Sequence, residues 1–126
     1  MVSSKKQKEE FRINQAKMNE VISSVNTLLG EFNSTFSDSA IEMEIKKKIS
    51  KAYISINKLE STKEKYNEIP HALIPLDDFL MQAAVSKKYH FSPEQDRIIK
   101  EYKHAYSKSH SGSLGAVLNA AALFHP

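Results

Sequence analysis

The sequence has 126 residues, a formal net charge of +3, and 40% hydrophobic and 26% charged residues, a composition typical of one globular domain. It contains no cysteine, which excludes disulfides, thiolate metal ligands and a cysteine nucleophile. It has no apolar stretch of about 18 residues and no secretory signal pattern, so we expect a cytoplasmic protein without a membrane span. Export without a cleavable signal peptide stays open.

A heptad-like pattern predicts a long first helix over residues 4–32. Phe11, Met18 and Val25 recur every seven residues, and further apolar residues widen the same face. A polar turn follows, and Ser39 with Glu42 forms the Ser-x-x-Glu pattern of a capping box. We therefore expect a second helix over 39–67, with Ile49 and Ile56 on its buried face, and an antiparallel hairpin over residues 1–68.

Pro70 and Pro75 predict a linker over 69–75, because proline lacks an amide hydrogen and biases the preceding residue to extended geometry. A third helix is expected over 76–88, with Asp77 and Asp78 at its N-terminal end. Ser92, Pro93 and Gln95 mark the start of a fourth helix over 93–109. Residues 114–124 are apolar nearly all round and predict a fifth helix that must be buried in this chain, a second copy or another protein.

These elements predict an all-α fold: one domain over 1–126, in which a long antiparallel hairpin carries two or three shorter helices from residues 76–126. A hairpin about 45 Å long exceeds the dimensions of a compact domain, whose radius of gyration is near 14 Å at this size. We therefore expect a homodimer, a larger helical bundle with coiled-coil-like packing. Its self-association seam would consist of Phe11, Met18, Val25, Ile49 and Ile56.

Catalytic chemistry has no support in the residue pattern. The five histidines have no metal-binding spacing, and neither a nucleophile motif nor a glycine-rich phosphate loop is present. We expect a non-enzymatic protein without metal, cofactor or small-molecule substrate. An enzyme would need a pocket in which His90 or His104 meets a carboxylate.

The basic residues offer an alternative function. Lys46, Lys47, Lys48 and Lys51 form the densest cluster, which predicts either a solvated helix face or a patch for an acidic partner. Charges of both signs are interspersed along the chain, and only two of the 18 basic residues are Arg, which argues against specific nucleic-acid binding. Weak nucleic-acid association through the Lys46–Lys51 region is the second hypothesis.

Apolar residues on the wrong helix face give the main functional hypothesis. Met43 and Ile54 lie nearly opposite the buried face of the second helix, and Met81 and Val85 leave the apolar face of the third. Either later segments of the chain cover them or they bind another protein. The expected protein-binding residues are Met43, Lys47, Tyr53, Ile54, Met81 and Val85.

The expected function is therefore that of a protein-binding module that occludes a partner, such as an inhibitor, an immunity factor, a chaperone or a small effector. The excess of Lys over Arg and the frequent Ile and Asn are typical of an AT-rich bacterial or phage genome.

Overall fold

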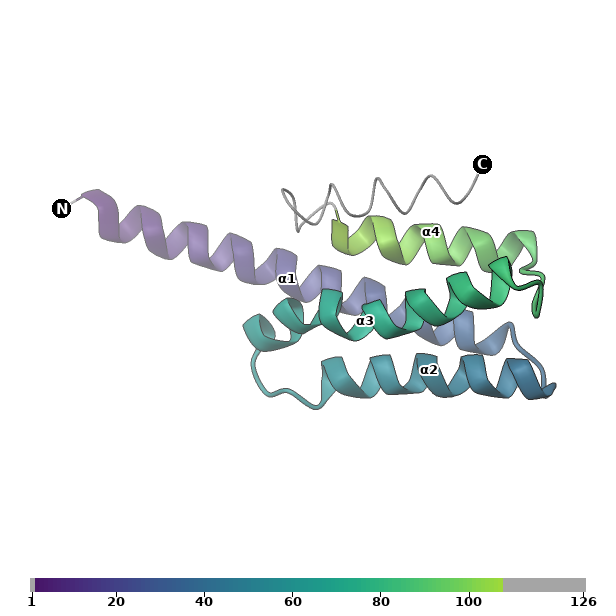
Figure 1. The fold of residues 1–126 in the computed structure, drawn as a ribbon. Helices are drawn as coiled ribbons and strands as arrows, with labels where there is room; N and C mark the ends of the chain where they lie inside the picture. The colour runs from purple at the N-terminus through teal and green to yellow at the C-terminus, as the bar shows by residue number, and fades with distance from the viewer. Residues whose placement is uncertain (1, 108–126) are drawn as a thin grey trace.

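A computed structural model describes the backbone of residues 2–107 and the side chains of residues 14–107. The described chain forms four helices, α1 (Val2–Ser34), α2 (Ala40–Asn57), α3 (Thr62–Val85) and α4 (Pro93–Ser107), and contains no strand. The predicted all-α fold is confirmed. Successive helices run in opposite directions (Figure 1). The helix predicted over 114–124 lies outside the described residues.

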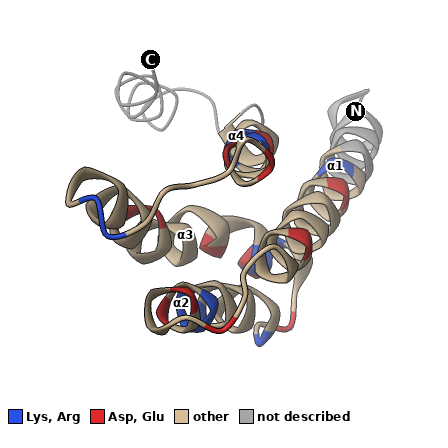
Figure 2. Ribbon diagram, turned by 90° about the vertical axis from the view of Figure 1, so that its right-hand side faces the viewer, with Lys and Arg blue, Asp and Glu red and all other residues tan. Residues whose placement is uncertain are grey.

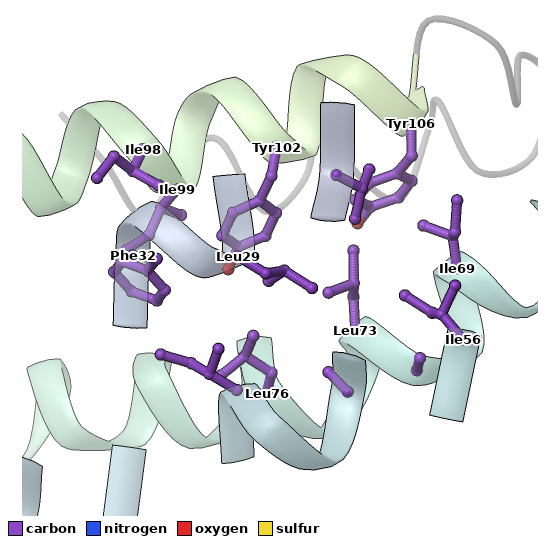
Figure 3. Packing of buried hydrophobic residues seen from close by; sticks show 14 of the residues in the cluster. Leu29, Phe32, Ile56, Ile69, Leu73, Leu76, Ile98, Ile99, Tyr102 and Tyr106 are labelled. Atoms are coloured by element: carbon purple, nitrogen blue, oxygen red, sulfur yellow. The ribbon is translucent and has the colours of Figure 1, made fainter. Parts of the chain in front are cut away.

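One hydrophobic core joins the four helices. The α1 helix contributes Val25, Leu29 and Phe32, which are completely buried, and α2 contributes Ile45 and Ile56. Side chains of α3 and α4 close the core, as Figure 3 shows: Ile69, Leu73, Leu76, Ile98, Ile99, Tyr102 and Tyr106. At 33 residues α1 is about 50 Å long, and its N-terminal half projects beyond the other three helices (Figure 1).

The α2 helix lies at one side of the bundle. It packs most extensively against α3 and less extensively against α1, whereas α1 packs chiefly on α4 and α3. At the α1–α2 contact, Asn26 and Asn57 exchange two side-chain amide hydrogen bonds of 2.9 and 2.8 Å. Because its two neighbours contact only part of its circumference, α2 keeps a face that no described helix covers.

The second predicted helix is too long. The α2 helix ends at Asn57, not at residue 67, and residues 58–61 form a connection to α3. The Ser61 hydroxyl donates to Glu64 Oε1 at 2.8 Å and accepts from the Glu64 amide at 3.1 Å, so Ser61 caps a new helix. The second arm of the predicted hairpin therefore ends at Asn57, and residues 62–68 belong to the next helix.

The predicted linker over residues 69–75 is wrong, because these residues lie inside α3. A proline within a helix costs about 3 kcal/mol. Here Ile69, Leu73 and Leu76 are at most 1% exposed, and burial of each such side chain stabilises the fold by about 1.5–3 kcal/mol, which offsets that cost. The helix predicted to begin at 76 therefore begins at Thr62, and Asp77 and Asp78 lie in its interior, not at its N-terminus.

A buried glutamine ties together the end of the bundle where α1 stops and α4 starts. As predicted, Ser92 and Gln95 cap α4: Gln95 Oε1 accepts from the Ser92 amide at 2.9 Å, and Ser92 Oγ accepts from the Gln95 amide at 3.1 Å. The Gln95 Nε2 group donates to the carbonyl and hydroxyl oxygens of Thr35 and to the Tyr89 hydroxyl, at 3.1–3.3 Å. Every polar atom of this buried side chain is therefore satisfied.

The same junction holds the start of α2. Glu42 Oε2 accepts hydrogen bonds from the Ser37 amide at 2.9 Å and from the Tyr89 hydroxyl at 3.3 Å, and Glu42 Oε1 accepts from the Ser39 hydroxyl. These bonds to the carboxylate, that of Ser37 first, lower the pKa of Glu42. The aromatic rings of Phe36, Tyr89 and Phe91 pack against one another beside this network. The N-terminus of α2 is thus fixed to both the α1–α2 turn and the α3–α4 loop.

The C-terminus of α3 ends in a Schellman motif that has lysine where glycine is preferred. The amide of Lys88 donates to the Ala83 carbonyl and that of Lys87 to the Ala84 carbonyl, at 3.0 and 3.2 Å. Lys87 has φ = 60°, the left-handed region, in which its Cβ approaches the following carbonyl oxygen.

We expect Lys87→Gly to raise the free energy of unfolding by about 0.5–1 kcal/mol, because glycine adopts this conformation without steric cost. Urea denaturation should show a higher midpoint at an unchanged slope. Lys87→Ala, which removes the same exposed side chain but keeps the Cβ, is the control and should give no increase. If Lys87→Gly were no more stable than Lys87→Ala, the left-handed conformation of residue 87 would carry no steric cost.

One ionisable pair lies between α3 and α4. The hydroxyl of the fully buried Tyr102 donates to Asp77 Oδ1 at 2.8 Å. Burial raises the pKa of Asp77, with Lys103 and the Tyr102 hydrogen bond opposing the shift, and burial followed by the Asp77 charge raises the pKa of Tyr102. The ionised form of Asp77 is therefore less favourable in the folded chain than in the unfolded chain.

A raised folded-state pKa means that the stabilising contribution of Asp77 is present below its unfolded-state pKa and is lost as the pH rises through the folded-state pKa. We expect Asp77→Asn, whose amide oxygen can still accept from Tyr102, to be more stable than the wild type at pH 7 and to lose that advantage on acidification to about pH 3. Thermal unfolding at both pH values measures this difference. If Asp77→Asn were less stable than the wild type at pH 7, the hydrogen bond from Tyr102 to the ionised carboxylate would stabilise the fold by more than burial of that carboxylate costs.

Candidate functional site

The principal residues predicted to bind a protein lie on the uncovered face of α2. Met43, Tyr53 and Ile54 are 45%, 44% and 60% exposed, and Lys47 is exposed beside them. No described helix covers this face. The segment 114–124, which the alternative would place over it, lies outside the described residues. In the end-on view of Figure 2, α2 lies at one edge of the molecule, and blue segments of its ribbon mark lysines.

A shallow groove follows this face and has a volume of about 630 Å³. We call it the α2 groove. Asn33, from α1, lies at its edge, and the Asn33 Oδ1 atom is buried without a hydrogen-bond partner among the described residues. The other lining residues come from α2 and the residue that follows it: Met43, Lys46, Lys47, Ser50, Lys51, Ile54, Ser55 and Lys58. Tyr53 is exposed but lies about 100° from Ile54 around the helix and does not line the groove.

The helical period explains why these side chains converge. Met43, Lys47, Ser50 and Ile54 are spaced by four, three and four residues, which places them within about 60° of one another. The buried residues Ile45, Ile49, Ala52 and Ile56 of α2 lie on nearly the opposite side of the helix. Because the buried residues fix the rotation of α2 about its own axis, the stripe on the opposite side faces solvent.

The groove carries unneutralised positive charge. Lys46 Nζ is 3.6 Å from Asp38 Oδ1, but the Asp38 side chain is 92% exposed, so this pair is weak. Lys47, Lys51 and Lys58 have no ion pair in the part of the chain whose side chains are described. Lys48, which belonged to the predicted basic cluster, lies instead 5.6 Å from the centre of the Phe79 ring of α3. Lys58 replaces it in the groove.

A second exposed apolar stripe lies on α3. Met81 and Val85, the secondary residues of the prediction, are 40% and 71% exposed. Ile74, which the prediction missed, is 60% exposed and lies seven residues before Met81, on the same side of the helix. Its spacing from Met81 and Val85 would have identified it had residues 69–75 been assigned to a helix. Nothing in the α2 groove comes from this stripe, so the two sets of predicted residues form separate surfaces.

The predicted self-association seam lies largely within the core of the chain. Val25, Ile49 and Ile56 are at most 2% exposed, so they contact other helices of the same chain. Met18 is partly exposed, and the side chain of Phe11 lies outside the described residues. A dimer through this seam as a whole would require the bundle to open, and the dimer itself stays a prediction.

Another groove, lined by residues of α1 and α4, has a volume of about 930 Å³. Its basic residue Arg97 donates to Glu101 at 2.8 Å and lies 4.0 Å from Glu94, so its charge is already paired. The lining residues are mostly polar and carry both signs of charge: Ser24, Leu28, Pro93, Asp96, Arg97, Lys100, Glu101, His104 and Ala105. This groove lacks the uniform sign of charge that the lysines give the α2 groove.

The described residues contain no cluster of three or more His, Asp or Glu side chains that could hold a metal ion. His90 and His104 are exposed, and neither forms an ion pair with a carboxylate in residues 14–107. Among the described helices none is long and apolar enough to cross a membrane.

No protein-family model matches this chain, and neither does any curated protein or solved structure.

Proposed function

We propose that this chain is a non-enzymatic protein-binding module that occludes a partner protein with the outer face of α2. Inhibitors, immunity factors, chaperones and small effectors act in this way. One observation carries the proposal: Met43 and Ile54, both exposed, lie about 16 Å apart along one side of α2 and are joined by a groove.

The residue types in this surface favour protein recognition. Large apolar side chains that gather in an exposed groove are typical of interaction sites, whereas isolated ones are normal on any surface. Methionine adapts to the shape of a partner, and tyrosine supplies a large contact area with a polar end. Met43, Tyr53 and Ile54 provide these properties on a helix that the junction around Gln95 fixes at its N-terminus.

The α3 stripe is not part of the proposed contact. Ile74, Met81 and Val85 are exposed, but no groove includes them among those described. Weak nucleic-acid association through Lys46–Lys51 is the second candidate, favoured by the unpaired lysines of the α2 groove. The apolar side chains of Met43 and Ile54 in the groove contribute nothing to phosphate binding, which is why we prefer a protein partner.

The decisive variant is Ile54→Asp, which places a charge in the middle of the proposed contact. We expect it to reduce partner capture at least about tenfold, because a truncated or charged residue at the centre of an interface costs more than about 1.4 kcal/mol. The measurement is affinity capture from a native lysate of the source cells, compared by quantitative mass spectrometry. Circular dichroism should show unchanged helix content, because residue 54 is exposed.

Ile74→Asp is the matched control, because it makes the same substitution at an α3 position that is 60% exposed, as residue 54 is. It should leave capture unchanged. If both variants captured as much as the wild type, or if only Ile74→Asp lost the partner, the α2 face would not be the binding site.

A further inference from the structure

We propose that the partner presents an acidic amphipathic α-helix, which lies along the α2 groove with its apolar residues on Met43 and Ile54 and its carboxylates beside the lysines. This inference rests on the proposed protein-binding function and specifies the chemistry of the partner. Three features of the groove support it: its shape, the placement of its charges, and the way its apolar residues are interrupted.

The shape of the groove suits a helix. Met43, Lys47, Ser50 and Ile54 occupy alternating positions four and three residues apart, which is the spacing of the contact seam in a coiled coil. From Met43 to Lys58 the groove extends over about 22 Å, the length of about four helical turns. A straight, shallow strip of this length accepts one helix lying along α2, the mode by which amphipathic helices bind grooves.

The charges flank the seam on both sides. Lys46 lies on one side, and Lys51 and Lys58 lie on the other, which are the positions that select the partner in coiled coils through charge pairing. Lys47 lies within the seam. Because Lys47, Lys51 and Lys58 have no ion pair in the described part of the chain, a partner's carboxylates gain attraction without displacing existing pairs. The groove therefore selects a partner of opposite charge.

The same charges argue against a second copy of this chain. In a symmetric dimer each surface meets its own copy, so the lysines of one groove would face those of the other. Like charges placed opposite one another across an interface are destabilising. The predicted dimer would therefore have to form through a surface other than the α2 groove.

The interruption of the apolar residues argues against a lipid surface. An interfacial helix buries a continuous apolar face in the membrane and keeps its lysines on the opposite face. Here Lys47 and Ser50 lie between Met43 and Ile54 on one stripe, so insertion of the stripe would bury a lysine. In a helix–helix contact, by contrast, a carboxylate of the partner can pair with Lys47.

The test uses a fluorescently labelled synthetic peptide of about three heptads, with leucine at the seam positions and glutamate at the flanking positions. Its matched control has lysine in place of each glutamate. Fluorescence anisotropy with the full chain should show saturable binding of the acidic peptide and at least tenfold weaker binding of the basic one. Raising the NaCl concentration from about 0.05 to about 0.5 M should weaken binding of the acidic peptide, because salt screens exposed charges.

Charge reversal in the groove locates the site. We expect Lys51→Glu with Lys58→Glu to weaken binding of the acidic peptide at least tenfold and to strengthen binding of the basic peptide. The control is Lys17→Glu with Lys100→Glu, which changes the net charge equally at exposed positions outside the groove and should bind as the wild type does. All four positions are exposed, so each variant should retain its helix content by circular dichroism.

Equal binding of the two peptides, or equal effects of the two charge reversals, would overturn this inference. So would tighter binding to double-stranded DNA or to anionic phospholipid vesicles than to the acidic peptide, with the same dependence on Lys51 and Lys58. If the wild type captures a protein in a manner sensitive to Ile54→Asp but insensitive to the groove charge reversal, the protein-binding function stands and the acidic-helix partner is wrong. If Ile54→Asp has no effect on capture, the proposed function fails as well.

Discussion

The buried amide of Gln95 determines how the ends of the helices meet. It closes the cap of α4 with Ser92 and, through its Nε2 group, contacts the end of α1 at Thr35 and the α3–α4 loop at Tyr89. Tyr89 in turn donates to Glu42, whose carboxylate accepts from the hydroxyl of Ser39, the residue that caps α2. An unsatisfied buried polar group costs about 1–3 kcal/mol, so each connection depends on the others staying in place. One side chain thereby sets the relative positions of three helix termini and one loop.

This constraint explains why α2 presents one face to solvent. Its N-terminus is held by the junction, Asn57 is hydrogen-bonded to Asn26 of α1, and its four buried residues pack in the core, chiefly against α3. With that orientation fixed at both ends, the stripe on the opposite side faces away from the bundle. A surface held by the fold needs little reordering on binding, which lowers the entropic cost of association.

The sequence predicted a helical element well where a pattern was complete within the element. The long first helix and the capping pairs Ser39–Glu42 and Ser92–Gln95 were predicted and are present. The Ser61–Glu64 pair has the same pattern, but apolar residues on either side of it continue the helical spacing, so the boundary at 58–61 was missed. At Pro70 and Pro75 the local rule failed because packing of Ile69, Leu73 and Leu76 outweighs the local cost of proline.

The candidate site was predictable only in part, for the same reason. Met43 and Ile54 could be placed opposite the buried face because the periodicity of α2 is local. The position of Asn33 beside the groove and the turning of Lys48 toward Phe79 depend on tertiary packing, which no local pattern encodes. The Gln95–Thr35 contact spans 60 residues and could not be foreseen from a capping pattern.

Methyl NMR spectroscopy tests the central claim most directly, because Met43 and Ile54 carry methyl groups at the two apolar contacts of the groove. With both methyl types labelled, titration with the acidic helical peptide should shift the Met43 and Ile54 resonances and leave those of Met81 and Ile74 on α3 in place. Shifts confined to Met81 and Ile74, or no shift at Met43 and Ile54 at saturating peptide, would contradict recognition at the outer face of α2.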